Sequence, residues 1–185
     1  MNAEEEYFIG ALGDAYIDWK RSEVQFFQKN LQWLDLINNV MERIFGVRGR
    51  IFKRDVWMLR KRSKRLAAEI RRLLGEPITD GRNFVAGLFD SEGSVYLSSK
   101  SKVPVVDFTQ CERGLCSLLV ARQALRALGI ESYLNGPYIH KHAKLPQYHL
   151  RIYGRIQCRQ FRRAIPIKHE EKLARFDSFM RDCKL

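Results

Sequence analysis

Cysteine is scarce in this 185-residue chain, and its spacing shows no metal-binding pair. The four cysteines form neither a CxxC motif nor the dense framework of a disulfide-rich secreted domain, so we expect reduced thiols in a reducing compartment. His140 and His142 are close in sequence. They lie in a basic segment without a matching cysteine pair, so we interpret the segment as a solvated loop rather than a zinc site.

Long hydrophobic runs are also missing. No apolar run approaches the ~20 residues of a membrane-spanning helix, and no basic-then-apolar leader precedes the acidic residues at positions 4 to 6. These absences argue against secretion and membrane insertion, and we expect a soluble, intracellular protein. With 45% hydrophobic residues, the chain can bury one good core or two small ones, so we expect one compact body.

Acidic residues are few relative to basic ones. The chain carries 33 Lys and Arg against 21 Asp and Glu, a formal net charge of +12, which indicates a polyanionic partner. Residues 1–46 hold four basic and eight acidic side chains, whereas residues 48–72 hold eleven basic and two acidic ones. In this second stretch, basic residues recur at every second or third position of β-prone sequence, which predicts several of them on one face of a sheet.

Two stretches pass from small and apolar residues into an acid and then into strand-like sequence. The stronger one spans residues 82–95 and predicts a helix that ends in a carboxylate. Gly87 and Ser91 lie four residues apart on one face of this helix, so a second helix could approach closely there. A similar stretch spans residues 7–17, and its acid is Asp14. The chain therefore consists of two related halves.

The same order of elements follows each motif helix. We predict a mixed α/β fold with two αββαββα halves, at residues 1–75 and 83–185, joined by a proline- and glycine-bearing connector at 76–82. Asp80 or Asn83 is expected to cap the second motif helix. The predicted strands are 16–19, 24–28, 50–53, 56–62, 93–99, 103–109, 130–138 and 147–153. The other predicted helices are 31–44, 64–74, 111–128, 155–164 and 168–180.

Residues 85–93, Val-Ala-Gly-Leu-Phe-Asp-Ser-Glu-Gly, match the nine-residue signature of the LAGLIDADG homing endonucleases position by position. With the second copy at residues 7–17, the chain resembles the single-chain members of that family, which carry two motifs. Aligned from its acidic end, the first motif has Asp14 at the catalytic position. Aligned on Gly10, it would have Ala15 there. We favour Asp14, because Gly-Asp-Ala-Tyr-Ile resembles a common ending of the family motif.

The resemblance implies that each half forms a four-stranded antiparallel sheet and that the two sheets form a saddle over the major groove of DNA. The motif helices would pack together at the interface, with Asp14 and Glu92 at the same end. Two nearby carboxylates repel each other unless a cation lies between them. The alternative, a pair of helix ends without chemistry, leaves unexplained why an acid opposes the helix dipole at this position.

A divalent metal ion is the cofactor that the resemblance implies. Asp14 and Glu92 would bind it together with Ala15 and Gly93, and the metal would polarise the scissile phosphate and orient the attacking water. The expected ion is Mg2+, with Mn2+ able to substitute and Ca2+ able to bind without supporting cleavage.

Three polar residues would flank the acids. By resemblance, Gln28 and Gln110 hold solvent and Lys29 balances phosphate charge; without the family, each is an ordinary polar strand end. The second half has Cys111 where the first has Lys29, so a second basic residue must come from elsewhere in the chain.

The exposed faces of the predicted strands carry side chains that suit double-stranded DNA. Arginine and lysine can bind guanine edges and phosphate, and glutamine can bind adenine edges. The residues predicted to contact DNA are Lys20, Gln25, Arg48, Arg50, Lys53, Arg60, Arg62, Lys100, Lys102, His149 and Arg151.

The sequence therefore predicts a site-specific, metal-dependent DNA endonuclease. It would act as a monomer, without a protein partner, on a long asymmetric duplex and leave staggered ends. The alternatives are an RNA maturase that assists intron splicing and a DNA-binding regulator that has lost cleavage. Retention of both acids favours the enzyme, since a protein that only binds needs neither. A generic basic scaffold protein would not account for the duplicated motif.

Overall fold

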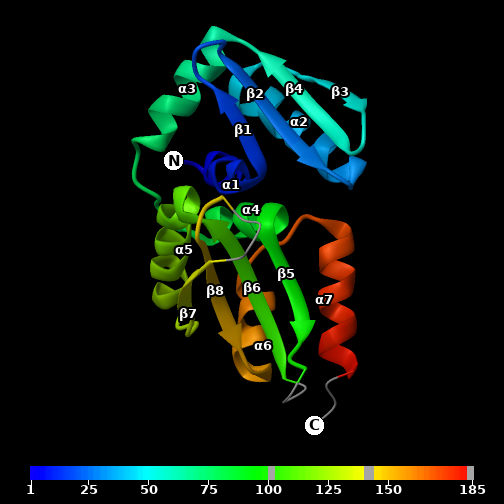
Figure 1. The fold of residues 1–185 in the computed structure, drawn as a ribbon, viewed down its shortest axis with the longest axis vertical. Helices are drawn as coiled ribbons and strands as arrows, with labels where there is room; N and C mark the ends of the chain where they lie inside the picture. Colours follow the sequence, from blue (N-terminus) through cyan, green and yellow to red (C-terminus); the bar gives the residue numbers. More distant parts are fainter. Residues whose placement is uncertain (100–102, 140–143, 183–185) are drawn as a thin grey trace.

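The structure, a computed structural model, describes residues 1–99, 103–139 and 144–182. Its two halves lie one above the other in Figure 1, and each contains a four-stranded antiparallel sheet. The strand order is β1-β2-β4-β3 in sheet A and β5-β6-β8-β7 in sheet B. This arrangement confirms the predicted fold class. In the part of the chain that the structure describes, no helix is long and apolar enough to cross a bilayer.

The elements of the two halves follow one another in nearly the same order. The first half comprises α1 (Ala3–Ala11), the 3-10 turn η1 (Leu12–Asp14), β1 (Ala15–Asp18), β2 (Glu23–Gln28), α2 (Leu31–Phe45), β3 (Arg50–Lys53), β4 (Trp57–Arg62) and α3 (Lys64–Leu74). The second half comprises α4 (Arg82–Glu92), β5 (Gly93–Leu97), β6 (Pro104–Cys111), the 3-10 turn η2 (Glu112–Gly114), α5 (Leu115–Ala127), β7 (Tyr133–Tyr138), β8 (Gln147–Tyr153), α6 (Arg155–Ala164) and α7 (Glu170–Asp182).

The sheets of the two halves share their register as well as their order. Phe26 of β2 pairs with Ala15 of β1, and Phe108 of β6 pairs with Gly93 of β5. Each strand that follows a motif helix therefore begins opposite a phenylalanine of its neighbouring central strand. Both phenylalanines are fully buried in the hydrophobic core. The duplication seen in the sequence thus extends to individual strand pairs.

Local sequence explains where two helices of the first half begin and end. Asn30 accepts a hydrogen bond from the Trp33 backbone N–H at 2.8 Å to start α2, and Gly46, in the left-handed conformation at φ 65°, ends it. Ser63 accepts a hydrogen bond from the Leu66 backbone N–H at 3.2 Å to start α3. Both helices bury their apolar faces against the inner side of sheet A and the first motif helix.

Helices α1 and α4 contact each other directly through their backbones at the boundary between the halves (Figure 1). A Cβ atom at Gly10 would lie 2.0 Å from the carbonyl oxygen of Phe84, and one at Gly87 would lie 2.0 Å from that of Tyr7. Any larger residue at either position would collide with the backbone of the facing helix. The close approach predicted at Gly87 is therefore confirmed, and Gly10 is its counterpart on α1.

Two element boundaries differ from the prediction by three residues or more, and the others agree within two residues. Strand β6 pairs with β8 as far as Cys111, so α5 starts at Leu115, four residues later than predicted. Strand β7 starts at Tyr133 rather than at residue 130. The reason is that the Ile130 backbone N–H still binds the Leu125 carbonyl oxygen, at 2.9 Å, and closes the end of α5.

The connector between the halves is held by a buried carboxylate. Glu6 of α1 is 1% exposed and accepts hydrogen bonds from the backbone N–H groups of Thr79, Asp80 and Gly81 at 2.6, 3.0 and 3.2 Å. The predicted cap by Asp80 or Asn83 is wrong: Gly81 begins α4 without a side-chain cap. A single carboxylate from the other half satisfies the N–H groups at this bend instead.

Candidate active site

Asp14 and Glu92 occupy equivalent places in the two halves. Asp14 ends the 3-10 turn after α1, Glu92 ends α4, and each is followed at once by the first strand of its sheet. Both side chains are partly buried. Burial and the charge of Glu92 raise the pKa of Asp14 to about 7, and burial also raises the pKa of Glu92. The structure thus brings the two predicted acids together as an electrostatically coupled pair.

The first motif is one residue shorter than the second. Gly10 and Gly87 make equivalent contacts across the helix interface and are 77 positions apart in the sequence. Ala15 and Gly93 begin equivalent strands and are 78 positions apart. The segment between the glycine and the strand is therefore one residue shorter in the first half.

The 3-10 turn compensates for the missing residue. A 3-10 helix rises about 2.0 Å per residue and an α-helix about 1.5 Å, so the three residues of η1 span the same ~6 Å as the last four residues of α4. Asp14, rather than Ala15, consequently takes the place that corresponds to Glu92. The irregular first motif is thus a tighter turn that carries its acid to the same end of the interface.

Gln28 and Gln110 each face one of the acids. Gln28 donates a hydrogen bond from Nε2 to Oδ2 of Asp14 at 3.1 Å, which opposes the rise in the pKa of Asp14. The Gln110 side chain likewise opposes the burial that raises the pKa of Glu92. Among the described residues, however, the buried Nε2 of Gln110 has no hydrogen-bond partner of good geometry. This donor is enclosed by protein and lies beside Glu92, so it acts on that carboxylate without a well-formed hydrogen bond.

Lys29 lies at the rim of the site. It is exposed one residue beyond β2, and its backbone N–H donates to Oε1 of Gln28 at 2.9 Å. Its counterpart Cys111 is partly buried and lines a groove of about 500 Å³ together with Gly13 and Gln110. The two halves thus present different chemistry at equivalent strand ends.

Lys172 of α7 is a site residue that the sequence did not reveal. Its ammonium group donates hydrogen bonds to the carbonyl oxygens of Phe89 and Ser91, at 2.9 and 3.0 Å, at the C-terminal end of α4. Burial lowers the pKa of Lys172 to about 8, although the neighbouring carboxylates oppose that shift. In return, its charge lowers the pKa of Asp14 and Glu92. The replacement of a lysine by cysteine at position 111 was the one hint that a basic residue would come from elsewhere.

Asp90 explains how α7 reaches the site. It is fully buried, and its Oδ2 accepts hydrogen bonds from the Tyr7 hydroxyl at 2.7 Å and from the Lys168 backbone N–H at 2.9 Å. The Tyr7 hydroxyl in turn accepts a hydrogen bond from Nε1 of Trp33 at 3.1 Å. Asp90 of the second motif therefore links Tyr7 of the first half to Lys168. Lys168 lies just before α7, about one helical turn before Lys172.

The donor set at the acid pair suits a hard divalent ion better than zinc. The described residues contain no group of three His, Cys, Asp or Glu side chains that could hold a metal. Magnesium needs only one or two carboxylates, with water and phosphate oxygens as its remaining ligands. Asp14 and Glu92 can supply those carboxylates. Burial, and then the charge of Glu92, raise the pKa of Asp14, and a bound cation would oppose both effects by favouring the charged carboxylate.

The strand register of sheet A shows on which face each residue predicted to contact DNA lies. Gln25 pairs with Arg60, and Arg60 pairs with Arg50, so these three share the face that points away from the core. Arg62 follows two residues later on the same face of β4. Lys53 alternates to the opposite face, where its ammonium group lies 5.5 Å from the centre of an aromatic ring of β4.

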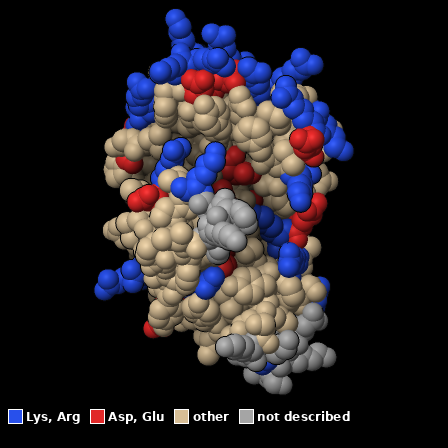
Figure 2. Space-filling view, in the orientation of Figure 1, with Lys and Arg blue, Asp and Glu red and all other residues tan. Residues whose placement is uncertain are grey.

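The remaining predicted basic residues of the first half lie outside this face. The Arg48 guanidinium binds Glu42 of α2 at 2.7 Å, and Lys20 is exposed in the turn between β1 and β2. Lys100 and Lys102 lie outside the described residues. Figure 2 shows lysine and arginine side chains crowding the surface of the first half, with acidic side chains recessed between the halves.

His149 and Arg151 lie on the outward face of sheet B. Their neighbours Leu150 and Ile152 are fully buried, so the alternation along β8 turns His149 and Arg151 away from the core. Both contact Asp107 of β6, at 3.0 Å in each case. Asp107 was not predicted as a site residue, because an isolated acid in a strand carries no periodic signal.

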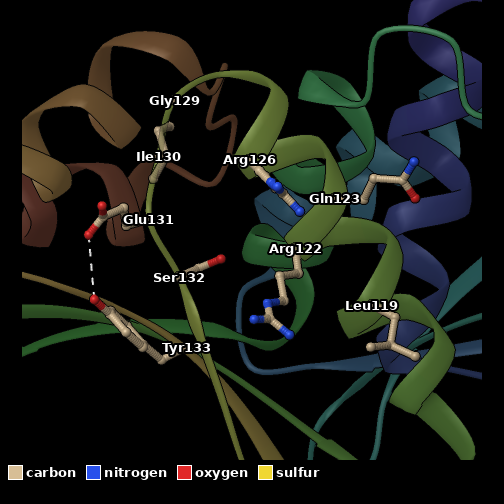
Figure 3. Close-up of a pocket in the computed structure, with 9 residues that line it drawn as sticks. All are labelled: Leu119, Arg122, Gln123, Arg126, Gly129, Ile130, Glu131, Ser132 and Tyr133. Carbon is tan, nitrogen blue, oxygen red and sulfur yellow. Dashed lines mark hydrogen bonds between the residues drawn. The ribbon is translucent and has the colours of Figure 1, made fainter.

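A pocket of about 760 Å³ lies away from the acids, between the end of α5 and the start of β7 (Figure 3). Arg122 and Arg126 of α5 line it, and its one carboxylate, Glu131, accepts a weak hydrogen bond from the Tyr133 hydroxyl at 3.4 Å. The pocket lacks a pair of coupled acids. The candidate active site is therefore the acid pair Asp14 and Glu92 at the ends of the motif helices, and not this pocket.

The family comparison matches the second half of the chain. Residues 81–166 match the model of the LAGLIDADG-like domain. No curated protein sequence matches the chain.

Solved structures match the fold of nearly the whole chain. I-DmoI in complex with DNA and Ca is 20% identical with a TM-score of 0.69, over 95% of this chain and 97% of that one. Mesophilic variants of the homing endonuclease I-DmoI are 22% identical with a TM-score of 0.66, over 95% and 97%. Full-length DUF199/WhiA from Thermatoga maritima is 17% identical with a TM-score of 0.65, over 100% of this chain and 63% of that one.

The signature at residues 85–93, the domain match around it and the fold shared over nearly the whole chain agree with one another. This protein therefore has the LAGLIDADG homing endonuclease fold, and its residues 81–166 match the LAGLIDADG-like domain.

Proposed function

We propose that this protein is a site-specific endonuclease that cleaves double-stranded DNA with the help of a divalent metal ion. The observation that carries the proposal is the coupled pair Asp14 and Glu92, held at equivalent ends of the two motif helices. Structures of the same fold support it, because I-DmoI was solved in complex with DNA and with Ca or Mn. The unlike halves favour a long asymmetric target, and a single chain with both acids favours action as a monomer.

The proposed chemistry divides between the ion and the protein. A bound Mg2+ or Mn2+ would polarise the scissile phosphate and lower the pKa of an attacking water, whereas Ca2+ would bind without supporting cleavage. Asp14 and Glu92 would hold the ion, together with backbone oxygens of Ala15 and Gly93. Cleavage of both strands would leave staggered ends.

The flanking residues would complete the site. Gln28 orients Asp14 through its hydrogen bond, and Gln110, beside Glu92, would hold solvent at the acid pair. Lys29, exposed at the rim, is suited to contact a phosphate group. Lys172 holds the end of α4 and so the backbone next to Glu92.

A second candidate function is DNA binding without cleavage. The observation that favours it is the ammonium group of Lys172, which already balances part of the charge of the acid pair in the protein alone. A regulator of this kind would use the outward faces of both sheets and would need no metal ion.

Cleavage of a randomised duplex library distinguishes the two functions. The library is incubated with Mg2+ or with Ca2+, and the DNA ends are sequenced. Discrete staggered ends in Mg2+ alone are the expected result, and they would also reveal the target. Selective binding in both ions without new ends would support the regulator. Affinity for duplex that hardly changes between about 50 and 200 mM salt would count against both, because phosphate contacts make binding steeply salt-dependent.

A further inference from the structure

The outward face of sheet B carries a buried acid at its centre. Asp107 lies in β6 between Val106 and Phe108, both of which are fully buried in the core. The alternation along the strand turns the Asp107 side chain to the other face, the one that bears His149 and Arg151. Asp107 is nevertheless only 4% exposed, so its neighbours on that face cover it.

Three donors from both neighbouring strands surround the Asp107 carboxylate. Oδ2 accepts a hydrogen bond from Nε of Arg151 at 3.0 Å, and Oδ1 lies 3.0 Å from Nδ1 of His149. The Tyr96 hydroxyl donates to Oδ2 at 3.2 Å from β5 on the other side. Thr109 places its hydroxyl 3.1 Å from the same ring nitrogen of His149. The cluster therefore fixes the directions of Arg151 and His149 at once.

Sheet A contains a related arrangement. Glu23 of β2 is 3% exposed and binds Nη2 of Arg60 at 2.5 Å, while Gln25 also contacts the Glu23 carboxylate. Arg60 and Arg151 occupy equivalent positions, because Leu59 and Leu150 pair with the equivalent phenylalanines of β2 and β6. Each outward face thus holds its central arginine on a buried carboxylate.

An acid on a surface that meets DNA lowers affinity, because it repels phosphate and cancels part of a nearby positive charge. The benefit of such an acid is that it can fix the direction of a neighbouring arginine. Asp107 engages the Nε edge of Arg151, and the Tyr153 side chain also hydrogen-bonds this arginine, which stays 24% exposed on the outward face. A fixed guanidinium fork matches the O6 and N7 acceptors of guanine in the major groove, whereas a freely rotating arginine binds any phosphate.

We propose that Asp107 is a positioning residue for sequence recognition, which holds Arg151 and His149 so that they contact base edges. Its negative charge lowers the affinity for DNA of any sequence, and the fixed side chains increase the preference for the target sequence. The inference rests on the proposed DNA-binding function. Asp107 itself need not touch DNA. Arg151 is the group that reads a guanine within the half of the target that sheet B covers.

Binding preference measured on the randomised duplex library, in Ca2+ to avoid cleavage, tests the proposal. Asp107→Asn keeps the shape of the side chain and removes its charge, and Arg151→Lys keeps a charge and removes the fork. Both variants should lose discrimination at the same single base pair, about fivefold or more, within the roughly 5- to 150-fold range of one bidentate contact. Glu131→Gln, which removes an acid beside the same sheet, is the matched control and should leave the preference unchanged.

Two further readouts separate positioning from a structural role. Asp107→Asn should bind non-target duplex at least as tightly as the wild type, because a repelling charge is gone, and the double variant should lose no more preference than Arg151→Lys alone. A uniform loss of affinity on all sequences with an unchanged preference would overturn the inference. A second result would also overturn it: Arg151→Lys loses the base preference, but Asp107→Asn keeps it and melts at the same temperature as the wild type. A wild-type protein that selects no duplex would overturn the proposed function, and this inference with it.

Discussion

Burial and the charge of Glu92 raise the pKa of Asp14 to about 7, although Asp14 and Glu92 end different helices and lie 78 positions apart in the sequence. Few groups in a protein titrate so close to neutral pH. The charge of the acid pair therefore depends on pH in the neutral range, where the protein would act.

Metal binding by the free protein should rise with pH through about 7. A cation needs the carboxylate of Asp14 in its charged form, so affinity for Mn2+ should increase roughly tenfold per pH unit below the pKa and level off above it. Calorimetric titration with Mn2+ between about pH 5.5 and 8.5 measures this dependence. Glu92→Gln should move the midpoint to lower pH, because it removes the neighbouring negative charge. A flat profile would contradict the coupling.

The free energy of unfolding of the metal-free protein should fall as pH rises, whereas metal binding should increase. Asp14 has a higher pKa in the folded protein than its ordinary value of 3.8, so the folded state binds more protons than the unfolded state between about pH 4 and 7. The free energy of unfolding attributable to Asp14 therefore falls as pH rises through this window. Urea unfolding in EDTA at several pH values tests the sign by comparing wild type with Asp14→Asn, whose stability should depend less on pH.

Gly10→Ala and Gly87→Ala should each destabilise the protein, because the added methyl group would meet backbone of the facing helix at 2.0 Å. We expect a loss of about 1–3 kcal/mol or more, a fall in melting temperature of roughly 2–4 °C per kcal/mol. Gly75→Ala is the matched control: its nearest contact would be an ordinary 3.4 Å and its φ is −90°. Equal melting temperatures for all three variants would contradict the helix contact.

Lys172→Met should destabilise the end of α4. The variant keeps the apolar stem but removes the ammonium group that binds the carbonyl oxygens of Phe89 and Ser91, so we expect a loss of about 1.5–3 kcal/mol in urea unfolding. It should also raise the pH midpoint of metal binding, since the charge of Lys172 lowers the pKa of both acids. Arg175→Met, an exposed change on the same helix, is the control. If the two variants have the same free energy of unfolding, Lys172 does not stabilise the end of α4.

Glu6→Gln should weaken the junction between the halves. The neutral amide cannot replace a carboxylate that accepts three backbone N–H groups, and a loss of about 1.5–3 kcal/mol is expected. Glu69→Gln, which removes the charge of an exposed ion pair with Arg72, should leave the free energy of unfolding nearly unchanged. Comparable losses in the two variants would show that the connector does not depend on Glu6.

Much of the fold was predictable because it rests on periodic patterns and local signals. The glycine at position 87 predicted a close helix contact, and Asp14 and Glu92 were found from the residues on either side of them. The strand alternation predicted most of the outward basic residues, but it grouped Lys53 with Arg50, which the register of β3 separates.

The residues that escaped prediction act through long-range contacts. Lys172 lies on an ordinary amphipathic helix, and only the path from Asp90 to Lys168 brings it to the acids. Asp107 and Glu6 are single carboxylates whose partners lie far away in sequence or in the backbone of another segment. No local pattern marks such groups, because their role depends on which elements the fold places beside them.

Cleavage and binding by Asp14→Asn and Glu92→Gln on the selected target show directly whether the coupled acids are catalytic. Asp18→Asn, which removes a neighbouring acid from sheet A, is the control and should cut like the wild type. Both site variants should bind the duplex within about threefold of the wild type and cut it roughly 100-fold more slowly or worse, because the acids serve the reaction rather than recognition. Cleavage by either site variant at the wild-type rate would contradict the assignment of the coupled acids as the catalytic centre.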